Sequence, residues 1–539
     1  MIMLRSDWVV TTVDKLGEVV SGGTPSTKVG EFWGGDIVWI TPADLSDFTG
    51  KRISRGARTI TKKGLATSSA RLMPPGTIVF SSRAPIGYVA IADVELCTNQ
   101  GFKSLIPANG VNSDYLYYYF RYIKNLAENR ASGTTFKELS MKAFASLPVV
   151  VAPSVEQRAI VAKIEALFSE LDKSVELLKT VKQQLKQYRQ AVLKAAFEGK
   201  LTAEWRSKQQ AAGRPLSADQ LLEQITKARD ERHQQLVWKA SGDSPRGRSR
   251  PVMRKITPLR NGAGGPDLGA LPEGWVWLDL GAVGDVSGGI TKNSKRAGLP
   301  HRFPYLRVAN VYANRLDLSD IAEIGVTEAE YAKALLEVDD VLFVEGNGSL
   351  DSIGRVAIWN GPISPCLHQN HLIKCRPVLR QMGRFILYWF LSPRGRRVII
   401  DKASSTSGLY TLSISKVSSL PIPVPSLAEQ QRIVEEIESR FSVLDELEKA
   451  VDQGLQRAEV LRQSILKKAF EGRLLSEAEL AAVRNDPEYE PADMMLERIR
   501  AEGKQNARQS MAKRTRTTAQ PNSRRRSEKS AEETVNSAR

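Results

Sequence analysis

The feature that most constrains the fold of this chain is an internal repeat. The segment LPVVVAPSVEQRAIVAKIEALFSELD, which begins at residue 147, matches LPIPVPSLAEQQRIVEEIESRFSVLD, which begins at residue 420, at 13 of 26 positions. Farther on, YRQAVLKAAFEGKL (188–201) matches LRQSILKKAFEGRL (461–474) at nine of 14 positions. The offset is 273 residues throughout, with no gap. A match of this length predicts two copies of one architecture.

The segments before these blocks correspond more loosely. VDKLGEVVSGGTPS (13–26) resembles LDLGAVGDVSGG (278–289), CTNQGF (97–102) resembles CLHQNH (366–371), and ASGTTFKELS (131–140) resembles ASSTSGLYTLS (403–413). Each copy is therefore a variable region of about 150 residues followed by a shared block. This organisation is what a protein needs if it reads two different ligands in the same way.

The variable regions are predicted to be mixed α/β domains with short strands. Residues 37–40, 77–80 and 341–344 are rich in apolar and β-branched residues, as strands are. Gly22–Gly23 and Gly288–Gly289 predict turns, whose simplest role is structural.

The repeated blocks are predicted to be long helices. Apolar residues follow a heptad-like spacing, which indicates a coiled-coil seam. The seam residues are Ile160, Ile164, Leu167, Leu171, Leu178, Val181, Leu185, Tyr188 and Val192 in the first copy, and Ile433, Ile437, Leu444, Leu447, Val451, Leu461 and Ile465 in the second. Gly199 and Gly472 are expected to cap the helix ends, and Gly454 to loosen the second helix.

A lone helix of this length cannot bury its apolar stripe, so the two copies are expected to pair with each other, antiparallel. Pairing with a partner protein or with a second copy of the chain is the alternative. The predicted fold class is α+β: two tandem mixed α/β domains separated by two long antiparallel coiled-coil helices, in a pseudo-two-fold internal duplication.

The domain boundaries follow from the repeat. We expect a first mixed α/β domain over 1–152, a central long helix over 153–202 and a basic linker over 203–271 with one helix (Ser217–Ala240). A second mixed α/β domain is expected over 272–425 and a C-terminal long helix over 426–475. A basic, disordered tail is expected over 476–539.

The net charge of +17 suggests a polyanionic partner such as nucleic acid. The charge is unevenly distributed: residues 206–260 carry a net +8 and residues 501–539 a net +6, which together supply 14 of the 17 charges. Basic linkers and tails are common in solvated segments, so charge alone supports DNA binding only weakly.

No catalytic signature was found in the sequence. It contains no phosphate-binding G-x-x-x-x-G-K-[ST] loop, no H-E-x-x-H and no G-x-S-x-G. No metal site is expected: Cys97, Cys366 and Cys375 form no Cys-x-x-Cys pair, and the first copy lacks counterparts of His368 and His371. No apolar run is long enough to span a membrane and the N-terminus does not resemble a signal peptide, so a cytoplasmic protein without a membrane partner is expected.

The EQ-x-x-IV-x-x-I blocks, the AFEG-[KR]-L helix ends and the W-x-x-x-x-L-G openings resemble the specificity (S) subunits of Type I restriction–modification systems over about residues 1–475. The resemblance implies a noncatalytic subunit that reads a bipartite, gapped site in double-stranded DNA. Its two mixed α/β domains would be target recognition domains, one for each half of the site, and its two long helices would be spacer helices of fixed length. It also implies docking of two copies of a DNA adenine methyltransferase subunit and of motor-nuclease restriction subunits. The chain itself would hold no cofactor, with S-adenosylmethionine, ATP and Mg on the partners.

The sequence leaves two alternatives to this interpretation. One is a self-sufficient DNA-modifying or DNA-cleaving enzyme, and the other is a coiled-coil protein-binding scaffold. The enzyme would need a catalytic motif, and the scaffold would not bind DNA in a salt-sensitive way.

Candidate DNA-reading residues are the polar and basic side chains suited to bases and phosphates. In the first domain these are Thr24, Lys28, Arg52, Arg55, Arg58, Lys62, Lys63, Arg83, Ser132, Thr134, Thr135 and Lys137. In the second they are Lys292, Lys295, Arg296, Arg302, Arg307, Asn347, Ser349, Lys402, Ser404, Ser405, Ser407 and Tyr410. The small polar loops before Leu139 and Leu412 are equivalent in position. Candidate subunit-docking residues are Glu156, Gln157, Glu429 and Gln430, although carboxylates also favour helix N-termini for electrostatic reasons.

Overall fold

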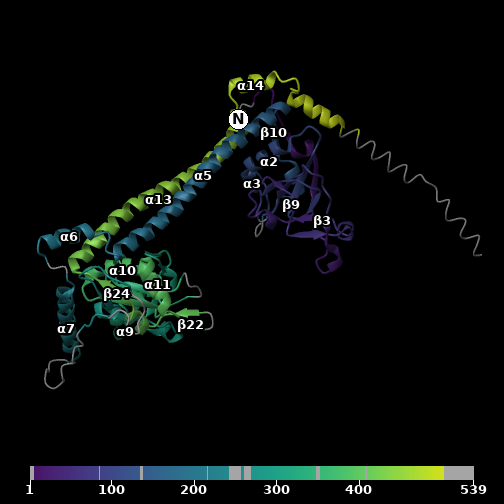
Figure 1. Cartoon of the computed structure of the whole chain (residues 1–539). Coiled ribbons are helices and arrows are strands. Elements are labelled where there is room, and N and C mark those ends of the chain that lie inside the picture. The colour runs from purple at the N-terminus through teal and green to yellow at the C-terminus, as the bar shows by residue number, and fades with distance from the viewer. Residues whose placement is uncertain are drawn as a thin grey trace, which may run out of the picture. The chain divides into compact units, whose positions relative to one another are not determined.

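The computed structural model describes residues 5–83, 85–133, 137–214, 217–241, 256–259, 269–347, 352–406, 409–502 and 505. The chain divides into two compact units, one formed by residues 1–178 and 453–539 and the other by residues 179–452. Each unit contains one recognition domain and parts of both long helices (Figure 1).

The first recognition domain has two sheets. The larger has the strand order β2 (Gly17–Ser21), β9 (Phe102–Pro107), β6 (Ile78–Ser81), β7 (Val89–Ala92), β4 (Arg52–Ile53). The smaller has the order β5 (Arg58–Ile60), β3 (Trp33–Ile40), β8 (Leu96–Thr98). The helices of this domain are α1 (Lys62–Ala66), α2 (Ser113–Tyr122), α3 (Lys124–Asn129) and α4 (Met141–Ala145).

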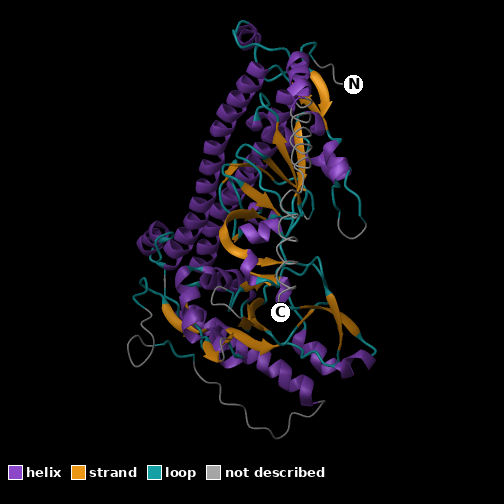
Figure 2. Cartoon of the chain, turned by 90° about the vertical axis from the view of Figure 1, so that its right-hand side faces the viewer, coloured by secondary structure: helices purple, strands orange, loops and turns teal. Residues whose placement is uncertain are grey.

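The second domain repeats this plan. Its larger sheet has the order β12 (Gly284–Gly288), β21 (Leu372–Pro377), β17 (Val341–Val344), β19 (Val356–Ile358). Its smaller sheet has the order β16 (Ala322–Gly325), β13 (Arg302–Leu306), β20 (Leu367–His368). A hairpin of β14 (Val311–Tyr312) and β15 (Arg315–Leu316) lies beside β19, and a small sheet has the order β18 (Gly346–Asn347), β23 (Leu409–Thr411), β22 (Ser404–Thr406). The helices are α8 (Leu280–Val283), α9 (Glu328–Ala334), α10 (Gly383–Leu391), α11 (Pro393–Lys402) and α12 (Ile414–Ser418) (Figure 2).

Each domain is joined to a spacer helix in the same way. β1 (Val9–Thr12) pairs with β10 (Pro148–Val151), and β11 (Val276–Asp279) pairs with β24 (Pro421–Val424), both antiparallel. The spacer helices α5 (Ser154–Phe197) and α13 (Leu427–Phe470) follow within three residues of β10 and β24. Each has 44 residues, which corresponds to about 66 Å of helix.

The two spacer helices pack antiparallel against each other, which confirms the predicted intramolecular pair. In the first unit Arg462 lies 4.8 Å from the centre of the Phe168 ring and binds Asp172. In the second unit Arg189 lies 4.6 Å from the Phe441 ring and binds Asp445 at 2.7 Å. The repeat offset of 273 relates all members of these clusters, so one Arg–Phe–Asp clamp occurs twice.

Most predicted seam residues are buried or half-buried, but Tyr188, Leu447 and Leu461 are 49%, 46% and 50% exposed and lie outside the seam. Gly454 does not interrupt α13. A Cβ at this position would lie 3.0 Å from Leu178 Cδ1, so the glycine allows close helix approach. Gly199 has a φ of +70°, as expected for a C-cap, and so does Gly472.

The segments expected to be a linker with one helix and a disordered tail each contain a pair of consecutive helices. After α5 come α6 (Ala203–Ala211) and α7 (Asp219–Ser241); after α13 come α14 (Glu477–Arg484) and a helix over 492–502. The prediction of disorder from residue 476 was therefore wrong as far as residue 502, and the single predicted linker helix was incomplete. The second helix of each pair begins with a repeated sequence, because ADQLLEQI (218–225) matches ADMMLERI (492–499) at five of eight positions.

The second helix of each pair buries apolar side chains at equivalent positions. Ala218, Leu221 and Ile225 are at most 2% exposed. Their counterparts Ala492, Met495 and Ile499 are at most 7% exposed and belong to the core of the first domain. Burial of apolar area outweighs the highly charged character of these segments. Among the described residues no helix is both long and apolar enough to cross a membrane.

Candidate nucleic-acid interface

Four loops converge at one end of the larger sheet in the first domain. Their described residues are 22–28, 82–83 with 85–87, 98–101, and 131–133 with 137–138. Backbone hydrogen bonds hold them side by side: Gly23 N–H donates to Thr98 O at 2.8 Å, Ser82 N–H to Gly101 O at 2.7 Å, and Leu139 N–H to Ser82 O at 2.8 Å. A Cβ at Gly22 would lie 1.9 Å from Asn99 O, so only glycine permits this approach. The turn predicted there thus brings the first loop against the third.

Polar side chains connect these loops. Thr24 Oγ1 hydrogen-bonds Gln100 Oε1, and Lys103 Nζ lies 3.4 Å from Gln100 O. Lys103 also lies 3.6 Å from a Glu138 carboxylate oxygen, which is paired in turn with Arg83 at 3.7 Å. Burial lowers the pKa of Lys103, and the Glu138 carboxylate opposes that effect. The result is a continuous polar surface built from all four loops.

Two indoles position the first loop. Trp39 Nε1–H donates to Gly23 O at 2.9 Å, and Trp33 Nε1–H donates to Ser26 O at 3.1 Å. Arg58 lies 3.5 Å from the centre of the Trp33 ring, a cation–π distance. The smaller sheet thereby brings the Arg58 guanidinium beside the loop that carries Thr24.

The second domain repeats the convergence with different side chains. Ile290 N–H donates to His368 O at 2.9 Å, Glu345 N–H to His371 O at 2.9 Å, and Leu412 N–H to Glu345 O at 2.7 Å. The predicted equivalence of the loops before Leu139 and Leu412 thus has a backbone basis. His371 Nδ1 lies 3.0 Å from Glu345 Oε2, whereas the first domain has Gly101 and Ser82 at these places.

Several predicted DNA-reading residues are exposed and have no carboxylate within 4 Å in the described part of the chain. They are Lys28, Arg55, Lys62, Lys137, Lys292 and Lys295. Lys402 is half-buried, and Tyr410 is half-buried in β23, where its backbone pairs with Asn347 and Ser405. Ser132 is exposed, and its backbone pairs with Glu138.

Other predicted cations already have carboxylate partners. Arg52 binds Asp114 at 2.9 Å, at the start of α2. Arg296 is 13% exposed and binds Glu330 through both terminal nitrogens. Ion pairs also join Lys63 to Glu31, Arg302 to Glu323 and Arg307 to Asp320. Thr134, Thr135, Ser349 and Ser407 lie outside the described residues, as do the side chains of Asn347, Ser404 and Ser405.

The four candidate docking residues are buried and bind partners within the chain. Glu156 accepts from Trp8 Nε1 at 3.1 Å, and Glu429 accepts from Trp275 Nε1 at 3.0 Å. The side-chain amides of Gln157 and Gln430 donate to Ala152 O and Pro425 O. All four side chains are at most 2% exposed, so a partner would contact neighbouring residues instead.

A cluster that sequence reasoning missed lies beside the loops of the second domain. Arg315 and Arg355 lie 4.5 and 5.2 Å from the centre of the Tyr312 ring, which is 36% exposed. Residues 312–315 form a turn whose Tyr-x-Asn-Arg sequence gave a weak signal. Arg355 comes from a distant position in the sequence, so no local pattern could connect it to Tyr312.

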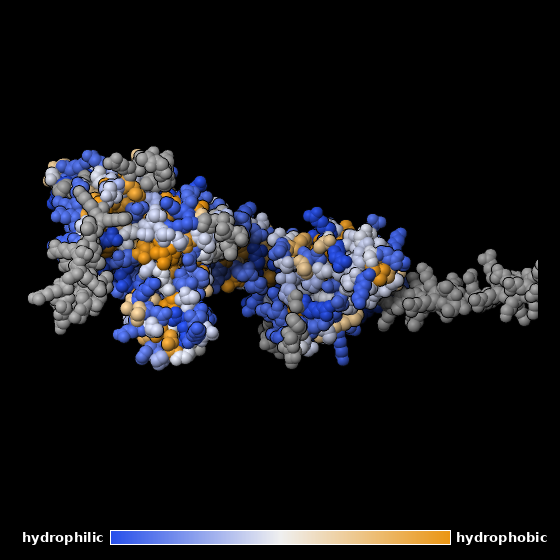
Figure 3. Space-filling model, turned by 90° about the horizontal axis from the view of Figure 1, so that it is seen from below, coloured by the Kyte–Doolittle hydropathy of each residue, from blue (hydrophilic) through white to orange (hydrophobic). Residues whose placement is uncertain are grey.

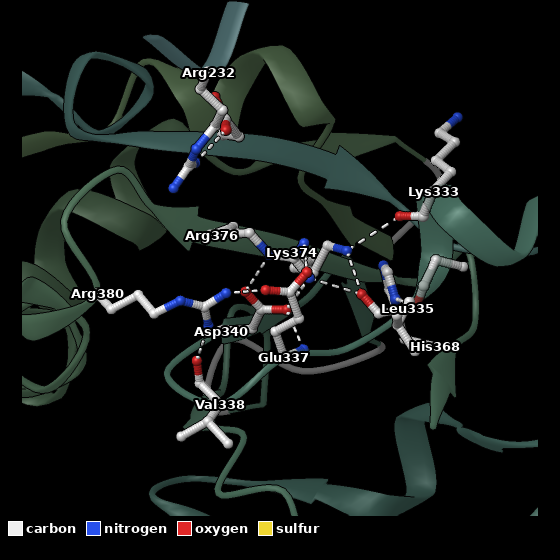
Figure 4. A network of polar contacts seen from close by, with 12 residues as sticks. Arg232, Lys333, Leu335, Glu337, Val338, Asp340, His368, Lys374, Arg376 and Arg380 are labelled. Carbon is white, nitrogen blue, oxygen red and sulfur yellow. Dashed lines mark hydrogen bonds and ion pairs between the residues drawn. The ribbon is translucent and has the colours of Figure 1, made fainter. Parts of the chain in front are cut away.

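The interior of the second domain contains a polar network on the inner strand β21 and just before β17, at the end of the larger sheet away from the loops (Figure 4). Arg376 binds Asp340 at 2.8 Å, and Lys374 Nζ donates to Leu335 O at 2.8 Å. Burial lowers the pKa of Lys374 to about 8. His368 is fully buried, with Nδ1 2.8 Å from Ala334 O, and the described residues contain no cluster of side chains suited to hold a metal ion.

We expect the second unit to lose stability on acidification. Burial, aided by the Lys374 ammonium, lowers the pKa of His368 to about 3. An unfolded chain has a histidine pKa of about 6.5, so it binds more protons than the folded state between these values. The free energy of unfolding should therefore fall as pH decreases through this window, by at most about 1.4 kcal/mol per pH unit.

Urea unfolding at about pH 7.5 and about pH 5.5 measures this effect. His368→Asn, which removes the titratable imidazole, should make the loss with acid smaller. An equal loss in both proteins would show that other groups cause it.

The comparisons with known proteins agree with this architecture. The family model described as the Type I restriction modification DNA specificity domain matches residues 5–187 and again residues 272–457. The specificity subunit of the Type I restriction enzyme MjaIX from Methanocaldococcus jannaschii is 45% identical over 174 residues, which are 31% of this chain and 39% of that protein. The EcoKI specificity subunit of Escherichia coli strain K12 is 26% identical over 391 residues, 70% of this chain and 69% of that protein.

The fold has a solved counterpart as well. A chain from a structure on complex assembly and conformational transition of the type I R-M system superposes with a TM-score of 0.58 at 17% identity. The superposition covers 87% of this chain and 99% of that chain. Two matches to the family model, two equivalent domains and paired spacer helices lead to one conclusion. This chain belongs to the Type I restriction–modification DNA specificity family and is a specificity subunit.

Proposed function

We propose that the chain reads a bipartite, gapped site in double-stranded DNA, with one recognition domain for each half-site. The observation that carries this proposal is the pair of four-loop surfaces, which share backbone hydrogen bonds but differ in their side chains. A shared frame fixes the orientation of each reader, and different side chains give different base preferences. The paired helices α5 and α13 would set the distance between the half-sites.

We also propose that the spacer helices dock two copies of a DNA adenine methyltransferase subunit, with motor-nuclease restriction subunits joining that complex. Large apolar residues on these helices are exposed, which is typical of a surface awaiting a partner. They are Leu177, Tyr188, Val443, Leu447, Val460 and Leu461, at 46–66% exposure. The face in Figure 3 is mostly hydrophilic, with several apolar patches among the hydrophilic areas. S-adenosylmethionine, ATP and Mg would be bound by the partners, in the cytoplasm.

Methylation mapping tests the proposal. The chain is co-expressed with the methyltransferase subunit encoded beside it, and methylated adenines are mapped across the host DNA. A gapped two-part motif that requires this chain is the expected result. Exchange of residues 22–138 for those of a relative should change one half of the motif, and exchange of 286–411 the other. These bounds keep β1, β10, β11 and β24, which join each domain to its helix. Absence of both methylation and DNA binding would instead favour the protein-binding scaffold.

The length of the spacer is expected to set the gap. Seven residues inserted after Leu178 and seven after Asp452 would lengthen both helices by one heptad and keep both Arg–Phe–Asp clamps paired. A heptad adds about 10.5 Å of helix, or roughly three base pairs of duplex. The motif should keep both halves with a gap longer by that amount. The same insertion in α5 alone shifts the clamps out of register and should abolish site-specific methylation. An unchanged gap in the double insertion would contradict the spacer role.

A further inference from the structure

We propose that Tyr312, Arg315 and Arg355 form a binding site for a backbone phosphate of DNA, next to the half-site read by the second domain. This inference rests on the proposed function and adds a ligand class and three residues to it. None of the three is among the residues that the sequence pattern indicated.

The cluster holds two positive charges on one aromatic ring. Arg315 and Arg355 lie 4.5 and 5.2 Å from the centre of the Tyr312 ring. A ring face attracts a guanidinium, but it does not neutralise two of them. In the described part of the chain, no carboxylate lies within 4 Å of either guanidinium. The nearby Asp317 carboxylate accepts hydrogen bonds from Ser319, and these bonds together with the charge of Arg315 lower its pKa, but it forms no ion pair with Arg315 within 4 Å. Neither guanidinium of the cluster therefore has an anion in direct contact among the described residues.

The cluster also has an unused hydrogen-bond donor. Arg355 Nε is buried and has no hydrogen-bond partner within the protein. A guanidinium offers a planar set of N–H donors that matches a phosphate, and a buried donor without a partner is costly. A bound phosphate oxygen could complete this set.

The position of the cluster suits a phosphate beside the recognition loops. Arg355 directly follows loop 345–354, and its carbonyl accepts from Val344 N–H at 3.0 Å. The turn that carries Tyr312 and Arg315 is fixed there because Asn314 N–H donates to Val356 O at 2.8 Å. The same loop binds Leu412, so the cluster lies at the loop end of the sheet.

The first domain provides a contrast at the corresponding sheet edge. Strand β4 pairs with β7, the counterpart of β19, and carries Lys51 and Arg52 beside it. There Asp114 binds Lys51 at 2.6 Å and Arg52 at 2.9 Å. The cations of that edge are neutralised within the protein, whereas those of the second domain are left for a ligand.

The test is the salt dependence of DNA binding. The full chain, in complex with its methyltransferase subunit, is titrated with duplex containing the mapped site at several KCl concentrations. Each lost phosphate contact should reduce the slope of log K against log salt by about 1. We expect that reduction for Arg315→Ala and Arg355→Ala, with the mapped motif unchanged. A neutral methylphosphonate placed at the contacted phosphate should remove the difference between the wild type and Arg355→Ala.

The matched control is Arg380→Ala. Arg380 is also exposed in the second domain, but it binds Glu337 and follows β21 at the end of the sheet away from the loops. Its slope should equal that of the wild type. Thermal unfolding of every variant separates a lost contact from a lost fold. A well-folded Arg315→Ala/Arg355→Ala double variant with an unchanged slope would overturn this inference alone. Absence of salt-sensitive DNA binding in the wild type would instead reject the proposed function.

Discussion

Removing residues 476–539 is expected to unfold the first recognition domain while leaving the second intact. The helices in this segment complete the core of the first domain. Leu480, Val483, Met495, Leu496 and Ile499 are all at most 7% exposed. Burying a large apolar side chain contributes about 1.5–3 kcal/mol, so their combined loss is on the order of 8 kcal/mol. That loss is comparable to the whole stability of a typical domain.

Urea unfolding followed with tryptophan probes in each unit would measure the effect. Trp8 and Trp39 report on the first unit, and Trp275 and Trp389 on the second. Deletion of residues 506–539 alone is the matched control, because it removes most of the basic charge but keeps both helices. Equal unfolding midpoints in the two deletions would show that the helices do not support the domain.

Replacement of Glu429 by alanine should destabilise the second unit strongly. The carboxylate is fully buried and accepts from Thr202 Oγ1 at 2.7 Å, from Trp275 Nε1 at 3.0 Å and from Arg206 Nη1 at 2.5 Å. Its removal leaves the Arg206 guanidinium, which is 14% exposed, without its carboxylate. Breaking a buried ion pair by removing one partner typically costs about 3–5 kcal/mol.

The same variant distinguishes a structural role from subunit docking. If Glu429 organises the start of α13, the unfolding free energy should fall, and binding of the methyltransferase subunit should weaken only to the extent that the unit unfolds. Glu429→Gln keeps the acceptor oxygen for Trp275 and should cost less than Glu429→Ala. A stable Glu429→Ala protein that no longer binds the methyltransferase subunit would favour the docking role instead.

The repeat made the fold predictable to a large degree. The repeated heptad pattern predicted two helices and their pairing, because a long amphipathic helix has few ways to bury its stripe. The helix pairs after these long helices escaped prediction for a physical reason. The match between them is eight residues long, and their highly charged composition resembles that of a solvated segment. Only the burial of Met495 and Leu221 distinguishes them from such a segment.

The candidate site was less predictable because side-chain type does not reveal the partner of a charge. Arg296 and Lys292 look equally suited to DNA in the sequence, yet Arg296 is held by Glu330 from a distant helix. The Arg355–Tyr312 contact likewise joins residues that are far apart in the chain. Loop placement was more accessible, since the glycine pairs and the motif before Leu139 and Leu412 indicated equivalent positions in both copies.

The composition of the units has a consequence for biosynthesis. The second unit is one continuous stretch, 179–452, whereas the first also needs residues from 453 onward. The first recognition domain therefore leaves the ribosome before the residues that finish its core, such as Phe470 and Met495, have been made. At a synthesis rate of about 5–20 residues per second, it waits roughly 20–70 s for residue 502. The domain made first is thus expected to mature last, and its exposed aromatic residues during that wait make it the natural client of a chaperone.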